Sequence, residues 1–398
     1  MDLRIFPGSL TGTLTAIPSK SQAHRLLICA AFSNTETTLR CPATNQDIEA
    51  TANCLRSLGA EIQYAEGSYH VSPIKQFPSD AILHCGESGS TLRFMLPIAG
   101  ALGVDATFIL EGRLPKRPLS PLWEELERNG CSLSRPTENT IRCQGKLRPG
   151  SYTIDGSVSS QFITGLLYAM ALMPGNSELS ITGKLESKPY IEMTQQALAL
   201  YGVSTTNYRV SGNYPFVTPG DLTVEGDWSN GAFFLTAKAL GSNITVCGLF
   251  ADSAQGDRAV AQILEKLDRH IVVNAADIPD LVPILAVAGG ARNGISFTNV
   301  GRLRLKESDR VETVAAMLRN LGATVQVAKD ELTVFPARYH SCTIDAAGDH
   351  RIAMAAAIAA TVADGPVTIL GAQCVAKSYP AFWNEYGRLG GNYEQYIR

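Results

Sequence analysis

The pattern of apolar and polar positions repeats along the chain. Four segments read as the last turn of an apolar-faced helix, then a glycine that ends it, then a strand. They are LRSLGAEI from Leu55, LERNGCSL from Leu126, LALYGVST from Leu198 and LRNLGATV from Leu318. LEKLDRHIVV from Leu264 fits without its glycine, and YGRLGG from Tyr386 is a shortened copy. The copies lie roughly 55 to 70 residues apart, which predicts about six repeat units.

Within a unit, strands alternate with helices. After LRNLGATV the pattern continues as QVAKDELTVF, which is typical of an antiparallel hairpin. Each unit is therefore expected to be a small α/β module with parallel and antiparallel strands. Six such modules could form one closed array or two domains of three. A single copy of the pattern could equally mark an ordinary helix end, so the prediction rests on the recurrence.

The predicted helix starts share a second feature. A cluster of Ser, Asp or Gly precedes an apolar helical stripe, as expected of an N-cap. The stretches are PSKSQAHRLLICAAF, GESGSTLRFMLPIAG, SVSSQFITGLLYAM, GDWSNGAFFLTAKAL and GDHRIAMAAAIAA. Helix starts offer free N–H groups to phosphate or carboxylate, and several of these also carry a cation. The cations of such loops are Lys20, Arg25, Arg93, Lys116, Arg117, Lys306, Arg310, Arg351 and Lys377. Each alone could be a solvated surface charge, but together they indicate an anion site.

Composition narrows the class of protein. The chain has 398 residues, enough for about two domains, and 45% of them are hydrophobic. A net charge of -3 gives no footprint for nucleic acid. Nine cysteines without a CxxC pair indicate reduced thiols in a cytoplasmic protein. The chain starts without a long apolar run, and AMAAAIAATVA is too short to cross a bilayer, so neither a signal peptide nor a membrane segment is expected.

Candidate acid–base groups lie among the cations. The stretch GRLRLKESDR from Gly301 holds three arginines and a lysine beside Glu307 and Asp309. Asp280, in ADIPDLVPILAVAG, is either a helix cap or, among dense cations, an ionised base. The six histidines are scattered, and neither a P-loop, a GxGxxG, an HExxH nor a GxSxG motif is present. We therefore expect no metal site and no nucleotide loop.

The ordered motifs resemble a known family. They are PSKSQAHR, CGESGSTLR, PKRPL, DGSVSSQF, SKPYI, VEGDWS, IPD, LRLKESDR, GDHRIAM and AKSYPAFW. Together they are similar to the 5-enolpyruvylshikimate-3-phosphate synthase family, from about residue 7 to about residue 385. The resemblance implies an α/β fold of two globular domains, each with three βαβαββ units around a pseudo-threefold axis, an inside-out α/β barrel. It implies one domain from residues 1–18 and 227–398 and a second from residues 19–226, with the active site in the cleft between them.

The resemblance also implies a reaction. The enolpyruvyl group of phosphoenolpyruvate would pass to the 5-hydroxyl of shikimate 3-phosphate by addition and elimination, without metal or organic cofactor, in a cytoplasmic monomer. Motif by motif, the implied phosphoenolpyruvate site is Lys20, Gly89, Arg117, Gln161, Arg310, Arg351 and Lys377. The implied shikimate 3-phosphate site is Ser21, Arg25, Ser159, Ser160, Gln161, Ser187, Tyr190, Asp280 and Lys306.

Within these sites the resemblance assigns acid–base roles. Asp280 is the expected base for the hydroxyl, and Lys20, Glu307 and Lys377 are the candidates for protonating the methylene carbon. Catalysis is therefore expected of Asp280, Glu307 and Lys20. The resemblance also implies the family's inhibitor glyphosate as a ligand, without indicating whether this chain is sensitive to it. Gly89 lies where a larger side chain would crowd the phosphoenolpyruvate site. Some family members have Asn at the positions of Glu87 and Arg302, so a substrate contact is not expected of either residue here.

Two other functions fit part of the pattern. One is the related enolpyruvyl transferase that acts on UDP-N-acetylglucosamine, which carries a reactive cysteine in an active-site loop. Neither Cys85 nor Cys131, the nearest candidates, lies in the corresponding loop KRPLSPLWEEL. The other is a catalytically inactive binding protein that keeps the anion sites. It would require the loss of Asp280, Glu307 or Lys20, and all three are present.

Overall fold

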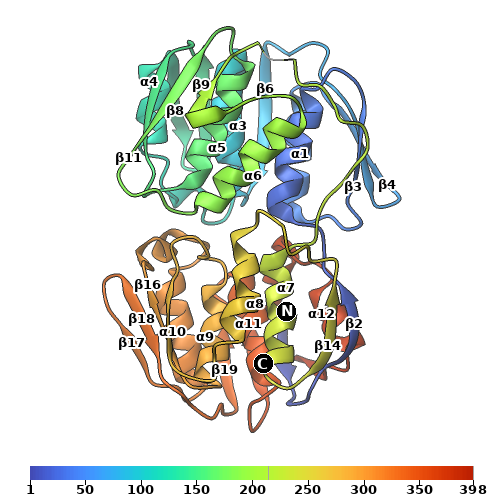
Figure 1. Cartoon of the computed structure of the whole chain (residues 1–398), viewed down its shortest axis with the longest axis vertical. Helices are drawn as coiled ribbons and strands as arrows, with labels where there is room; N and C mark the ends of the chain where they lie inside the picture. Colours follow the sequence, from blue (N-terminus) through green and yellow to red (C-terminus); the bar gives the residue numbers. More distant parts are fainter. Residues whose placement is uncertain (214, 398) are drawn as a thin grey trace. The chain divides into compact units, whose positions relative to one another are not determined.

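The computed structural model describes residues 1–213 and 215–397 and divides the chain into two compact units. Unit 1 comprises Met1–Ile17 and Gly226–Arg398, and unit 2 comprises Pro18–Glu225 (Figure 1). The chain enters and leaves unit 2 at neighbouring points, because the Ser19 amide donates to the Glu225 carbonyl at 2.7 Å. Each unit has a hydrophobic core of its own.

Unit 2 contains three small sheets of similar topology. Each begins with a parallel strand pair and continues with antiparallel strands. The first sheet has the order β13 (Leu222–Thr223), β3 (Thr37–Arg40), β5 (Ser68–Ser72), β4 (Glu61–Ala65). The second has β6 (Asp80–Gly86), β7 (Asp105–Leu110), β9 (Thr140–Gly145), β8 (Cys131–Thr137). The third has β10 (Ser151–Asp155), β11 (Ser177–Thr182), β12 (Arg209–Val210).

The helices of unit 2 are of two kinds. Three inner helices are buried on almost every side: α1 (Lys20–Ala31), α3 (Gly89–Leu102) and α5 (Ser160–Leu172). Three outer helices bury one face: α2 (Gln46–Ser57), α4 (Leu122–Arg128) and α6 (Lys188–Leu200). α3 and α5 pack closely (Figure 1) because Gly165 lacks a side chain; a Cβ there would lie 2.2 Å from the Arg93 carbonyl oxygen.

Unit 1 has three sheets as well. The first has the order β19 (Cys342–Asp345), β20 (Val367–Leu370), β1 (Asp2–Ile5), β21 (Tyr393–Tyr396). The second has the order β15 (Ile271–Asn274), β16 (Ile295–Thr298), β18 (Glu331–Val334), β17 (Val325–Val327). The third pairs β14 (Asn243–Cys247) with β2 (Thr11–Thr15) in parallel. The first two repeat the arrangement of unit 2, with one parallel pair and then antiparallel strands.

The helices of unit 1 follow the same division. The inner ones are α7 (Trp228–Ala239), α9 (Val282–Gly290) and α11 (His350–Ala360), which pack on one another. The outer ones are α8 (Val260–Leu264), α10 (Arg310–Asn320) and α12 (Phe382–Arg388). α10 buries residues at helical spacing, including Val311, Val314, Ala315 and Leu318, and leaves its other face polar.

The predicted six repeats and the α/β fold class are confirmed. The glycines of the repeated pattern follow α2, α4, α6, α10 and α12, and all have positive φ, as a helix-terminating residue there requires. They are Gly59, Gly130, Gly202, Gly322 and Gly390, with φ between 81° and 118°. The sixth outer helix, α8, ends without one, as its sequence indicates.

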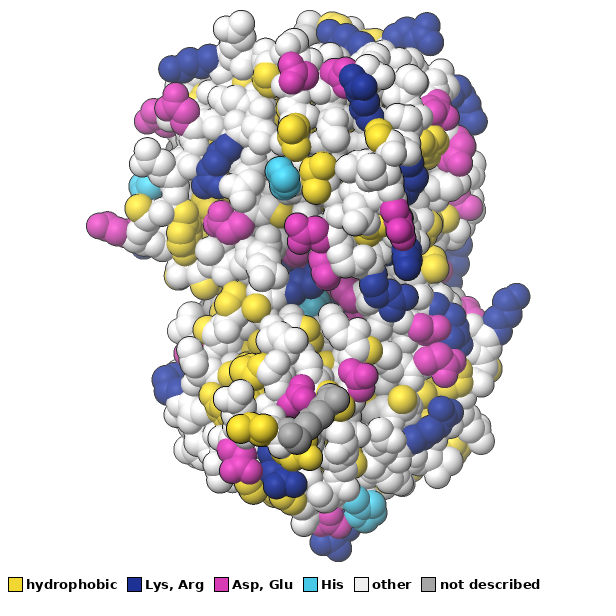
Figure 2. Space-filling model, turned by 180° about the vertical axis from the view of Figure 1, so that it is seen from behind, with side chains coloured by type: hydrophobic (Ala, Val, Ile, Leu, Met, Phe, Trp, Pro, Cys, Tyr) yellow, Lys and Arg dark blue, Asp and Glu magenta, His cyan; other side chains and the backbone are white. Residues whose placement is uncertain are grey.

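Three further features of the structure are its surface charge, the length of its helices and the state of its cysteines. Figure 2 shows lysine and arginine interspersed with aspartate and glutamate on the visible face, rather than an extended field of one sign. Within residues 1–213 and 215–397, no helix combines the length and the apolar character needed to cross a membrane. All nine cysteines are free thiols.

Candidate active site

The inner helices of unit 2 begin with serine. Ser19, Ser88 and Ser159 are the N-caps of α1, α3 and α5, and each side chain accepts a hydrogen bond from a backbone N–H of its own helix. None of the three helices has an acidic residue in its first turn. The positive ends of these helices are therefore not neutralised by their own sequence, which favours an anion from outside.

Lys20 is the first residue of α1. Its Nζ lies 2.7 Å from Oδ2 of Asp47 on α2, and the lysine side chain is 17% exposed. Asp47 is buried. The pairing holds the ammonium group in place next to the start of the helix, where it can still meet a ligand.

Gln161 has a fixed orientation at the start of α5. Its Oε1 accepts from Arg93 Nη1 at 2.7 Å, and its Nε2 donates to Ser90 Oγ at 2.8 Å. Arg93 also donates to the Pro118 carbonyl at 3.0 Å and stacks on the ring of Phe162. The carboxamide is thereby held beside the first turn of α3.

Gly89 lies against two arginines. A Cβ on this residue would be 2.7 Å from Arg117 Nη1 and 3.0 Å from Arg93 Nη1. The structure thus brings Gly89, Arg117 and Gln161, which are widely separated in sequence, into one neighbourhood of unit 2 with Arg93 at its centre.

Arg25 joins α1 to α6. Its guanidinium donates to the Ser21 carbonyl at 2.6 Å, to the Tyr190 carbonyl at 2.8 Å and to Thr194 Oγ1 at 2.9 Å. The residue is only 2% exposed. Three predicted site residues therefore lie together, and Arg25 has most of its donors engaged with the protein.

Ser187 begins α6 in a left-handed conformation, with φ of 56° and ψ of 40°. A residue other than glycine adopts this region at a cost, and such conformations are enriched at functional positions. Ser187 is buried, as is Ser160 at the start of α5. The three serines predicted to hold a phosphate, Ser159, Ser160 and Ser187, all lie at helix starts of unit 2.

In unit 1 the inner helices begin with aspartate instead. Asp227 caps α7 and accepts from the Asn230 amide at 2.8 Å, and Asp349 caps α11 and accepts from the Arg351 amide at 3.0 Å. Asp280 lies just before α9. Cations from the neighbouring segments gather on Asp280 and Asp349.

Arg310 is the centre of this network. Its Nη1 lies 2.8 Å from Asp280 Oδ1, its Nη2 lies 2.7 Å from Glu307 Oε2, and its Nε lies 2.9 Å from Asp349 Oδ2. Its side chain is 1% exposed. One guanidinium thus fixes three carboxylates, and the Asp349 and Glu307 carboxylates help raise the pKa of Arg310 against the opposing effect of burial.

Asp280 receives two further cations. Arg351 Nη2 lies 2.9 Å from Oδ2, and Lys306 Nζ lies 3.6 Å from Oδ1. Burial opposes the charged form of Asp280, but Arg351, Lys306 and Arg310 outweigh it and hold the pKa of this carboxyl well below its ordinary value. Asp280 is therefore an ionised carboxylate in the free protein, available to accept a proton when a ligand replaces part of this network.

Lys306 and Lys377 complete the cluster. Burial lowers the pKa of Lys306 to about 8, although the Asp280 carboxylate opposes the shift. Lys377 Nζ lies 3.8 Å from Glu307 Oε1. Every site residue predicted for unit 1, namely Asp280, Lys306, Glu307, Arg310, Arg351 and Lys377, therefore belongs to one connected group of charges.

Several residues that hold these groups were not predicted from the sequence. Asp47 pairs with Lys20, and Asp349 pairs with Arg310. Arg93, recognised only as a loop cation, orients Gln161. Their one sequence signal is a place at or next to a helix start, which an ordinary cap shares. Glu87 is an exposed residue beside Gly112, and Arg302 lies near enough to Lys306 to contribute to its lowered pKa.

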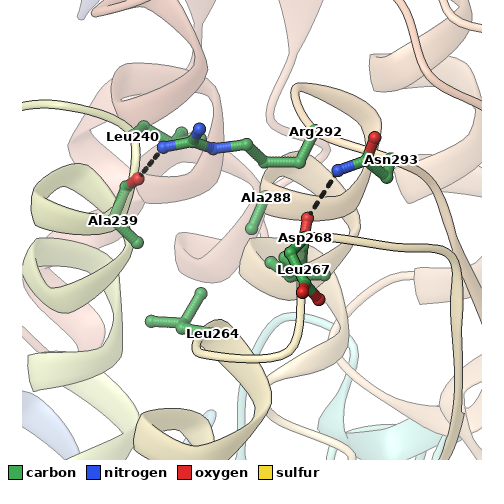
Figure 3. Close-up of a pocket in the computed structure, with 8 residues that line it drawn as sticks. All are labelled: Ala239, Leu240, Leu264, Leu267, Asp268, Ala288, Arg292 and Asn293. Carbon is green, nitrogen blue, oxygen red and sulfur yellow. Dashed lines mark hydrogen bonds between the residues drawn. The ribbon is translucent and has the colours of Figure 1, made fainter.

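Three cavities among the described residues lie away from the predicted site residues. Figure 3 shows one of about 180 Å³ in unit 1, lined by residues at the C-terminal ends of α7, α8 and α9. Arg292 there donates to the Ala239 carbonyl, and Asn293 Nδ2 donates to the Leu267 carbonyl at 2.8 Å. None of the predicted site residues lines it. Within the described ranges, no group of three or more His, Cys, Asp or Glu side chains could hold a metal ion.

Comparison with known proteins places this arrangement in a family. The family model of EPSP synthase (3-phosphoshikimate 1-carboxyvinyltransferase) matches residues 6–278 and 269–386. The chain belongs to the EPSP synthase family. Relatives named 3-phosphoshikimate 1-carboxyvinyltransferase include one from Clostridium botulinum, 36% identical over 99% of this chain and 98% of the relative. Another, from Clostridium kluyveri, is 37% identical over 98% of both chains.

A solved EPSP synthase from Acinetobacter baumannii has the same fold. It superposes with a TM-score of 0.81 over 99% of both chains, at 22% sequence identity. The family model and the relatives of 36% and 37% identity confirm the family expected from the sequence. The structural likeness confirms the fold class.

Proposed function

We propose that the chain transfers the enolpyruvyl (1-carboxyvinyl) group of phosphoenolpyruvate to the 5-hydroxyl of shikimate 3-phosphate, releasing phosphate, as a step of aromatic amino acid biosynthesis in the cytoplasm. The observation that carries the proposal is the convergence of Lys306, Arg310 and Arg351 on Asp280. It supplies both an ionised base and the cations that two phosphorylated substrates need, in a chain of the EPSP synthase family.

The proposed chemistry balances without a cofactor. Asp280 takes the proton of the 5-hydroxyl group while the hydroxyl oxygen forms a bond to C2 of phosphoenolpyruvate. The methylene carbon of phosphoenolpyruvate accepts a proton from Lys20, Glu307 or Lys377. The product of this addition is a tetrahedral ketal phosphate. Loss of a methyl proton to a base, with departure of phosphate, then restores the double bond and gives the enol ether. Glu307 is supported as the acid–base group by its contact with both Arg310 and Lys377.

The shikimate 3-phosphate site is proposed on the serine-capped helix starts. Ser159, Ser160 and Ser187 would hold the 3-phosphate through hydroxyl and backbone N–H groups. Ser21, Arg25, Gln161 and Tyr190 would hold the ring, supported by the bonds that keep Ser21, Arg25 and Tyr190 together. Lys306 and Asp280 of unit 1 would contact shikimate 3-phosphate near its 5-hydroxyl group.

The phosphoenolpyruvate site is proposed on Lys20, Gly89, Arg117, Gln161, Arg310, Arg351 and Lys377. Arginine forks suit both its carboxylate and its phosphate. Support comes from the neighbourhood of Gly89, Arg117 and Gln161 in unit 2 and from the buried guanidinium groups in unit 1. The proposal requires residues of both units to contact the same two substrates.

The transferase that acts on UDP-N-acetylglucosamine is a weaker fit. Cys85 is fully buried, and burial raises the pKa of its thiol well above the ordinary value. Cys131 is also buried, in β8. Neither side chain has the exposure that a reactive cysteine in an active-site loop needs. The inactive-homologue alternative is disfavoured because Asp280 and Glu307 are both present and are bonded to the same arginine, Arg310.

The proposal is tested by measuring phosphate release from phosphoenolpyruvate with each acceptor. Turnover is expected with shikimate 3-phosphate and none with UDP-N-acetylglucosamine. The reverse preference, or release with neither acceptor, would refute it. A crystal structure with both substrates tests the site residues, since Lys20, Arg117, Arg310 and Arg351 must then contact ligand.

A side chain at Gly89 is expected to weaken binding of phosphoenolpyruvate. In Gly89→Ala the new methyl group would overlap Arg117 and displace its guanidinium. The KM for phosphoenolpyruvate should rise about tenfold to a hundredfold, the cost of misplacing a binding group by about an ångström. The inhibition constant of glyphosate should rise as well. Gly8→Ala is the matched control, because nothing lies within 4 Å of its Cβ. An unchanged KM in Gly89→Ala would remove Arg117 from the site.

Binding of shikimate 3-phosphate is expected to weaken in alkaline solution. The pKa of Lys306 is lowered to about 8, so the free protein loses this ammonium charge above about pH 8. The kcat/KM for shikimate 3-phosphate should then fall by about tenfold per pH unit. Lys306→Arg should abolish this decline, because arginine stays charged. Lys266→Arg, at an exposed position, should leave it unchanged. If kcat/KM still declined with rising pH in Lys306→Arg, the decline would be due to another titrating group.

A further inference from the structure

Asp257 is a buried carboxyl that the proposed mechanism does not use. It lies in the short helix η3 (Gly256–Ala259) and is 2% exposed. One oxygen, Oδ2, forms a hydrogen bond with Ser229 Oγ in the first turn of α7. The other, Oδ1, has no hydrogen-bond partner among the described residues.

The segment that carries Asp257 is held firmly against the start of α7. Gln255 Oε1 accepts from the Trp228 amide at 3.0 Å, and its Nε2 donates to the Gly226 carbonyl at 2.8 Å. α7 packs on both α9 and α11, whose starts carry Asp280 and Arg351. Asp257 is therefore fixed within electrostatic range of both groups, and each of them affects its ionisation.

A purely structural role does not account for this carboxyl. The cap of α7 is already supplied by Asp227, which accepts from the Asn230 amide. A buried oxygen without a partner costs free energy, and an asparagine or serine would bond Ser229 at lower cost. Burial of this carboxyl therefore has an energetic cost that its single bond to Ser229 does not offset.

We propose that Asp257 is a positioning residue that carries its proton in the active enzyme and, by staying neutral, leaves the positive charge of Arg351 available to anionic phosphoenolpyruvate. This inference rests on the proposed function. Loss of the proton would add a negative charge next to the binding groups, draw Arg351 away from Asp280 and weaken substrate binding.

The surroundings of Asp257 set the pH at which this change occurs. Burial, followed by the negative charge of Asp280, raises the pKa of Asp257 to about 7, and Asp227 at the start of α7 acts in the same direction. Arg351 on α11 and the bond from Ser229 oppose the shift. Arg258, on the same short helix, is exposed and donates to the Ala251 carbonyl. Asp257 is therefore neutral below about pH 7 and charged above it. By linkage, binding of an anion should raise its pKa and draw a proton from solution.

The test compares the pH dependence of the KM for phosphoenolpyruvate, at saturating shikimate 3-phosphate, in wild type and Asp257→Asn. Substrate phosphates themselves titrate near about pH 6, so the informative quantity is the difference between the two proteins. From about pH 6 to about pH 8 the wild-type KM should rise roughly fivefold to tenfold more than that of Asp257→Asn, as one added unit charge predicts. Asp252→Asn removes an exposed carboxylate from the same loop and should follow the wild-type profile.

A second variant tests the same proton. Ser229→Ala removes the bond that favours the ionised form, so the rise of KM should move to higher pH rather than disappear. Identical profiles of wild type, Asp257→Asn and Ser229→Ala would overturn the inference. If circular dichroism shows that Asp257→Asn does not fold, the inference is tested by Ser229→Ala alone. The pH at which the KM for phosphoenolpyruvate rises must then be higher in Ser229→Ala than in wild type. Failure of the proposed function is distinct, because wild type itself would then show no turnover.

Discussion

Asp280→Asn is expected to lower kcat by about two to four orders of magnitude, the range for loss of a positioned acid–base group. Asparagine can accept a hydrogen bond from Arg310 or from Arg351 but not from both, because its amide nitrogen replaces one of the two oxygens. It can neither accept the hydroxyl proton nor carry the charge. Binding of shikimate 3-phosphate, measured by calorimetry, should be partly kept, because the serine-capped helix starts of unit 2 are untouched.

Asp268→Asn is the matched control for that measurement. Asp268 is an exposed aspartate of the same unit, outside the charge network, so the substitution should leave kcat at the wild-type value. If Asp280→Asn turned over as fast as the control, Asp280 would be a helix-start residue and the proposed base would have to be sought elsewhere.

Arg310→Met should destabilise unit 1 by about 3–5 kcal/mol, the effect of removing one partner from a buried ion pair. Methionine approximates the volume of the arginine stem but leaves the buried Asp349 carboxylate without its guanidinium, and leaves Asp280 and Glu307 with one cation fewer. Urea unfolding followed by fluorescence would measure the loss, and phosphate release should become undetectable in the same protein.

The same segment offers a control of the same residue type. Arg304 also bonds two carboxylates, Asp309 and Glu312, each at 3.0 Å, but its side chain is 31% exposed. Arg304→Met should therefore cost about 0–1 kcal/mol, as solvated ion pairs do. Equal losses in the two variants would mean that burial of the Arg310 network does not govern its contribution to the free energy of unfolding.

The local elements of the fold could be predicted from the sequence, but the strand partners could not. The glycines after the outer helices and the polar clusters before the inner ones mark helix ends, because caps depend on adjacent residues. Pairing in the sheets depends on residues far apart. β3, for example, pairs with β13, which lies near the other end of unit 2 in the sequence. β2 precedes unit 2 in the sequence and pairs with β14, which follows it. Periodicity carries no information on such partners.

The candidate site divides in the same way. Lys306, Glu307 and Arg310 could be identified because they are adjacent in sequence and unusually charged. The carboxylates that organise them could not, since Asp349 reaches Arg310 from another helix start and Asp47 reaches Lys20 from a different helix. Only the folded geometry distinguishes these aspartates from ordinary caps. The same holds for Arg93, whose role is defined by Gln161 of a neighbouring helix.

The place of β1 has a consequence for synthesis. This strand, Asp2–Ile5, lies between β20 and β21 and forms hydrogen-bonded pairs with both, so it must wait for two strands that are made after the whole of unit 2. Unit 2 is one continuous stretch, Pro18–Glu225, and has all its strand partners as soon as it leaves the ribosome. The nascent chain can therefore complete unit 2 during translation, while the Arg310 cluster lies in the unit that closes only after β20 and β21 have been made.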